Sequence, residues 1–158
     1  MAAPPTLATT AEYFRIGLLV GLLSAEEASA WATAVIARLE DPPYELIEVS
    51  WSKGLASTLE ALSSVQGERD KYLAGSWLLG RLRESLPHAD GELQFAARQA
   101  MQVARAAELG DETHYRFDMV DDELSLARTK VYGTVEECRV NFLNELAGYP
   151  AHRPRGDA

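Results

Sequence analysis

The sequence predicts an all-α fold, either a compact multi-helix bundle or a short stack of helix pairs, with about seven helices. Apolar residues recur at helical spacing through most of the 158-residue chain. Gly and Pro divide it into segments with short connectors. Two segments open with a capping box, Ser24 with Glu27 and Thr134 with Glu137. No pair of strands suggests itself, so the chain reads as helices throughout.

The length suits one domain. We expect a flexible N-terminal tail at residues 1–8, a single helical domain at 9–149 and a flexible C-terminal tail at 150–158. The terminal segments contain small residues, prolines and few periodic apolar positions. The prediction therefore places all packing between them.

The first helix is expected from about residue 9 to residue 23, and its apolar second half indicates a central position. Gly17 and Gly21 lie four residues apart, a spacing that lets another helix approach closely. The second helix is expected to begin at the Ser24 capping box and to end before Pro42.

Residues 42–51 can be read in two ways. Asp41 can cap a short helix with Pro42 at its first position. The β-rich run "IEVSW" favours an extended segment instead. Because no second strand is available for pairing, we choose the helix.

The later helices follow from apolar periodicity and breaker residues. They are expected at residues 55–65, 68–86, 92–109, from 113 or 118 to 131, and 134–148. Gly110 is expected to end the 92–109 helix in the left-handed conformation that glycine favours.

Charge and composition restrict the function. The chain has 24 acidic and 15 basic residues and a net charge of −9, which argues against nucleic-acid or anionic-membrane partners. It suits a basic protein partner. With Cys138 as its one cysteine, the chain has no internal disulfide, and a reducing cytoplasm is the expected compartment. The apolar run at 16–23 is shorter than the roughly 20 residues that a membrane helix needs.

No catalytic signature is present: GxGxxG, GxxxxGK[ST], GxSxG, HExxH and CxxC are all missing from the sequence. Cys138 falls on the apolar stripe of the last helix, where a buried hydrophobe is expected rather than a nucleophile. We therefore predict that the protein is not an enzyme and uses no cofactor or metal.

The segment "DETHYRFDMVDDELSLA", residues 111–127, holds six carboxylates and His114. Wound as a helix, it has a narrow apolar stripe made of Phe117, Val120, Leu124, Ala127 and Val131. One flank of that stripe carries His114, Asp118, Asp121 and Asp122, which we call the acidic ridge. Glu123 lies on the other flank with Arg116.

Four interpretations of the acidic ridge stay open: a solvated helix face, a protein-binding surface, a metal site and an acid–base pair. His114, Asp118 and Asp122 have the four-residue spacing that can bring ligands together around a metal. Adjacent carboxylates can raise one another's pKa for acid–base chemistry. Neither role has a second set of ligands or a pocket in the sequence.

The three tryptophans differ in the burial that their sequence positions predict. Trp31 and Trp77 lie on helix stripes and are expected in the core. Trp51 follows an irregular region and stands beside Lys53, so both a core position and an exposed binding edge remain open.

These observations favour a small, acidic, cytoplasmic protein-binding domain, such as an immunity- or antitoxin-like inhibitor that neutralises a basic partner protein. The partner-binding residues are predicted to be His114, Asp118, Asp121, Asp122, Glu123 and Trp51. One alternative is a helical adaptor or scaffold with a peptide groove around Tyr44, Ile47 and Trp51. The other is an enzyme with a metal site that includes His114. The oligomeric state is left open.

Overall fold

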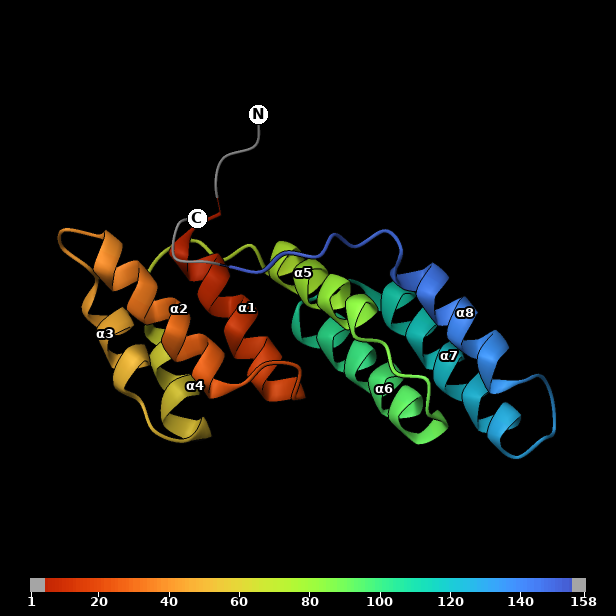
Figure 1. Cartoon of the computed structure of the whole chain (residues 1–158). Helices are drawn as coiled ribbons and strands as arrows, with labels where there is room; N and C mark the ends of the chain where they lie inside the picture. Colours follow the sequence, from red (N-terminus) through yellow and green to blue (C-terminus); the bar gives the residue numbers. More distant parts are fainter. Residues whose placement is uncertain (1–4, 155–158) are drawn as a thin grey trace. The chain divides into compact units, whose positions relative to one another are not determined.

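A computed structural model describes residues 5–154, drawn in Figure 1. These residues form eight helices and no strand, which confirms the all-α class. In chain order the helices are α1 (Leu7–Val20), α2 (Ala25–Arg38), α3 (Tyr44–Trp51), α4 (Leu55–Ser64), α5 (Lys71–Glu84), α6 (Asp90–Ala106), α7 (Asp111–Arg128) and α8 (Val135–Leu146).

The chain forms two compact units. Among the described residues, unit 1 comprises residues 5–74 with 153–154, and unit 2 comprises Gly75–His152. The first turn of α5 belongs to unit 1 and the remainder of that helix to unit 2. A chain with two compact units can unfold as one domain or as two. The single domain expected at 9–149 therefore stays a prediction.

In unit 1, α1 packs against α2 and α4, and α3 packs against α2 and α4. Helix α1 is buried on nearly all sides, as expected for a central helix. It begins at Leu7, two residues before the predicted start, because the Thr6 hydroxyl accepts a hydrogen bond from the Thr9 N–H at 3.0 Å. Residues 7 and 8 of the predicted tail therefore belong to α1, and residues 1–4 lie outside the described part.

Gly17 of α1 and Gly21, its C-cap residue, shape the helix C-terminus, and the atoms nearest to Gly17 belong to Leu23 in the following turn. Gly21 has a φ of 79° and reverses the chain after the helix. The reversal brings Leu23 against Gly17, where a Cβ would meet the Leu23 Cδ1 at 2.3 Å. Gly17 therefore provides the space in which the leucine side chain is buried.

Helix α2 opens with the predicted capping box. The Ser24 N–H donates to the Glu27 carboxylate at 2.9 Å, and the Glu27 N–H donates to the Ser24 hydroxyl at 3.2 Å. Residues 44–51 are helical, which settles the alternative between helix and strand. The predicted cap was wrong: Pro43, not Asp41, occupies the N-cap position.

In unit 2, α7 packs against α6 and α8, and these three helices lie side by side in Figure 1. Alanines cover the buried face of α6, so its neighbour can approach closely. The rings of Phe117 and Phe142 join α7 to α8 with centroids 5.9 Å apart. Thr134 caps α8 by accepting from the Glu137 N–H at 3.1 Å, one half of the predicted capping box.

The end of α6 differs from the prediction. Glu108, with a φ of 54°, takes the left-handed position expected for Gly110. The Glu108 N–H donates to Arg105 O at 3.2 Å, and the Leu109 N–H donates to Ala104 O at 2.9 Å. This pair of bonds is a Schellman motif. Gly110 instead occupies the N-cap of α7, with a φ of 102°.

The segment after α8 follows α5 within unit 2. Arg83 donates to the Ala147 carbonyl at 3.2 Å, and the His152 ring lies over that of Trp77 with centroids 4.1 Å apart. Burial lowers the pKa of His152 from its ordinary 6.5. The first residues of the predicted C-terminal tail thus have packing contacts, whereas residues 155–158 lie outside the described part.

Candidate functional site

Helix α7 carries the acidic segment and presents its predicted apolar stripe to the core. Phe117, Val120, Leu124 and Ala127 are all buried. Val131 was expected to extend this stripe, but it lies beyond the helix and is 69% exposed. The chain leaves the helix at Lys130, whose φ of 59° turns the next residue away from the stripe.

Asp121 contributes to the packing of α6 on α7. Its Oδ1 atom accepts from Gln94 Nε2 at 3.0 Å and from Arg98 Nε at 3.2 Å. Gln94 is 5% exposed, and its Oε1 atom accepts a hydrogen bond from Arg128 Nη1. The Asp121 carboxylate is thus neutralised by α6, which sequence spacing along one helix did not reveal.

His114 also faces α6. Its Nε2 atom lies 3.2 Å from Nη2 of Arg105. A guanidinium donates only, so the Nε2 atom of His114 is the acceptor in this contact. The acidic ridge therefore consists of two parts: His114 and Asp121 contact α6, while Asp118 and Asp122 face outward.

Asp118 is half-buried and Asp122 is exposed. Neither has an ion-pair partner among the described residues.

The carboxylate oxygens of Asp118, Asp121 and Asp122 lie within 4.8 Å of one another. A metal there would compete with Arg98 and Gln94 for Asp121, and His114 does not belong to the cluster. The local charge is therefore negative, with two carboxylates free to meet a cation.

An apolar stripe also lies on the outer side of α7. It consists of Tyr115, Met119 and Leu126, which are 60%, 42% and 42% exposed. Their separations of four and seven residues place them on one helix face. We call these three residues the outer stripe. The signal was present in the sequence, but these positions lie outside the apolar stripe that the prediction assigned to the core.

Carboxylates flank the outer stripe on both sides. At 100° per residue, Asp118 and Asp122 lie on the side of the outer stripe that is nearer α6. Glu112 and Glu123 lie on the side that is nearer α8. An exposed apolar line between two acidic edges is the main surface feature of α7. Of the predicted binding residues, Asp118, Asp122 and Glu123 adjoin it.

A groove of about 240 Å³ lies between α7 and α8. Met119 and Val120 provide apolar lining, and the half-buried Glu123 and Glu145 approach it from the two helices. Arg116 at this groove donates to Glu112 at 2.8 Å. The groove thus has apolar surface and two carboxylates that have no ion-pair partner among the described residues.

Cys138 is buried on the stripe of α8, as predicted. Burial raises the pKa of its thiol, and the carboxylates of Glu123 and Glu137 raise it further. The thiol is therefore held in its protonated, weakly nucleophilic form.

Trp51 lies on the surface of unit 1, at the end of α3, and is 77% exposed. Tyr44, at the start of the same helix, is 68% exposed, and Leu55 on α4 is 53% exposed. Trp31 and Trp77 are buried, as predicted. Trp51 is thus a surface residue, unlike the other two tryptophans.

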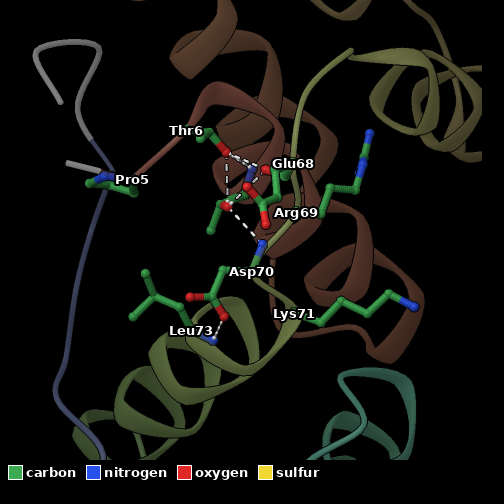
Figure 2. Close-up of a pocket in the computed structure, with 8 residues that line it drawn as sticks. Pro5, Thr6, Glu68, Arg69, Asp70, Lys71 and Leu73 are labelled. Carbon is green, nitrogen blue, oxygen red and sulfur yellow. Dashed lines mark hydrogen bonds between the residues drawn. The ribbon is translucent and has the colours of Figure 1, made fainter. Parts of the chain in front are cut away.

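A separate pocket of about 460 Å³ in unit 1 adjoins the start of α5 (Figure 2). The hydroxyl of Thr6 donates to the Glu68 carbonyl at 2.6 Å, and the Asp70 N–H donates to the Thr9 hydroxyl at 2.9 Å. Figure 2 shows the side chains of Arg69 and Lys71 extending away from Pro5. The pocket's polar groups thus bind one another and join the start of α1 to the start of α5.

No helix in residues 5–154 has both the length and the apolar character needed to cross a membrane. Comparison of the chain with protein-family models, curated proteins and solved structures found no match.

Proposed function

We propose that the chain is a small acidic protein-binding domain that binds a basic partner protein through the outer stripe of α7 and the carboxylates beside it. One observation carries this proposal: the exposed Tyr115, Met119 and Leu126 lie between acidic edges that include Asp118 and Asp122. An apolar centre with a polar rim, enriched in aromatic and Met residues, is typical of protein interfaces.

The charges support a basic partner. The chain has a net charge of −9, and Asp118 and Asp122 have no ion-pair partner among the described residues. Such a surface attracts cationic proteins and accelerates their association. An inhibitor of the immunity or antitoxin kind, acting in the cytoplasm, would use it to cover the basic active site of an enzyme.

The test is affinity capture from native cells with two tagged forms, the wild type and Asp118→Lys/Asp122→Lys, followed by identification of the captured proteins. We expect a basic protein to be recovered by the wild type and lost from the variant. The identified partner, purified, should bind the wild type with an affinity that falls as salt increases.

Asp41→Lys/Glu60→Lys is the matched control, because it changes the net charge equally at exposed positions outside α7. This control should recover the partner like the wild type. Equal recovery by all three forms would contradict the proposal, and equal loss from both variants would show that only net charge matters.

A second candidate is a helical adaptor that binds a peptide on α3. It is favoured by the exposure of Trp51 and Tyr44, 77% and 68%, on the same helix. Large exposed aromatics are common at binding hot spots. Trp51→Ala would abolish this binding, which should survive high salt, whereas binding by α7 should weaken with salt.

A further inference from the structure

We infer that the partner presents a cationic amphipathic helix, which lies along α7 with its apolar side on the outer stripe. This inference rests on the proposed function and adds the kind of element that occupies the surface. The stripe from Tyr115 to Leu126 covers eleven helical steps, or roughly 16 Å at 1.5 Å per residue. That length is about three turns of a partner helix.

The distribution of charge selects the partner's pattern. Acidic residues occur on both sides of the stripe: Asp118 and Asp122 lie on one side, and Glu123 lies on the other with Glu145 of α8 at the groove. Glu112 on this second side is already ion-paired with Arg116. A helix with an apolar stripe between two rows of Lys or Arg is complementary to this arrangement. A helix with basic residues on one side only would leave one acidic edge unmatched.

The groove between α7 and α8 adds a site for one long basic side chain. Met119 and Val120 can contact the aliphatic stem of a Lys or Arg, while its charged head reaches Glu123 and Glu145. Both carboxylates are half-buried, so an ion pair formed there is less screened than one on an open surface. The groove should therefore fix the register of the bound helix.

The test uses three synthetic peptides of about 18 residues, roughly five helical turns. The first has Leu on one helical stripe, Lys on both sides of it, and Gln and Ala elsewhere. The second has the same composition in an order that breaks the stripe. The third has Glu in place of every Lys. Binding to the full chain is followed by fluorescence anisotropy, and peptide helicity by circular dichroism.

We expect the first peptide to bind and become helical, and the other two to bind at least about tenfold more weakly, a difference of about 1.4 kcal/mol. Met119→Asn should weaken binding of the first peptide by a similar factor. Glu123→Gln/Glu145→Gln should also weaken it, whereas Asp41→Asn/Glu60→Asn should not. Thermal unfolding of each variant establishes that it is folded.

Equal binding of the first and second peptides would overturn the inference, because charge alone would then account for it. Binding without a gain of helicity would overturn it in favour of an extended occupant. Sedimentation of the chain alone tests a second copy as occupant: a dimer dispersed by Met119→Asn would also overturn it. In each case the proposed function survives if capture of the native partner still depends on Asp118 and Asp122.

Discussion

Arg69 and Glu12, 57 residues apart in the chain, form a buried ion pair in unit 1. Arg69 Nη1 donates to Glu12 Oε2 at 2.6 Å, and Glu12 is 2% exposed. The other carboxylate oxygen accepts from Arg15 on the same helix. Arg69 Nη2 also donates to three carbonyls at the end of α4, those of Leu62, Ser63 and Val65, at 2.7, 3.0 and 3.0 Å. One side chain thus joins α1 to the C-terminus of α4.

Arg69→Met should destabilise the protein by about 3 kcal/mol, because it leaves a buried carboxylate with one partner instead of two and removes the donor to three carbonyls. Urea unfolding followed by circular dichroism measures the change. Arg116→Met is the matched control. Its ion pair with Glu112 is exposed, so the loss should be below about 0.5 kcal/mol. Equal losses in the two variants would contradict the assigned role of Arg69.

The ion pairs of Glu12 with Arg15 and Arg69 predict that the stability of the protein depends on pH. Burial would raise the pKa of Glu12, but hydrogen bonds from Arg15 and Arg69 outweigh it, and the pKa falls below the ordinary 4.5. Its contribution to stability is therefore complete above pH 4.5 and is lost as the pH falls through the lowered folded-state value. Glu12→Gln should be less stable near neutral pH and should lose less stability on acidification. Urea midpoints measured through this range test it, and parallel curves for both proteins would count against it.

The sequence was sufficient for features that depend on neighbours along one helix. Apolar periodicity located the helices, and the Ser24–Glu27 box located the start of α2. It was insufficient for pairs on different helices, such as Asp121 with Arg98, because helical spacing does not say which charged face meets which. For the same reason the sequence could not show that α6 neutralises part of the acidic ridge.

Gly80 permits the chain after α8 to pass directly over α5. A Cβ at this position would meet the Pro150 carbonyl oxygen at 2.3 Å, and backbone cannot move aside as a side chain can. Gly80→Ala should therefore cost about 1–3 kcal/mol, the usual effect of overpacking. It should also increase proteolytic cleavage after α8. Gly148→Ala is the control, since a Cβ there meets nothing within 4 Å. Unchanged stability and cleavage in Gly80→Ala would disprove the close contact.

Glu108 and Lys130 occupy the left-handed position after α6 and α7, with φ values of 54° and 59°. This conformation costs a non-glycine residue about 1 kcal/mol, so glycine should stabilise the protein at both positions. The gain should be larger for Glu108→Gly, because it also removes a negative charge from a helix C-terminus, whereas Lys130→Gly removes a favourable positive one. Glu60→Gly, inside α4, should instead destabilise by about 1 kcal/mol. Thermal and urea unfolding of the three variants measure the order, and a loss of stability in Glu108→Gly would show that the carboxylate contributes more than the backbone strain costs.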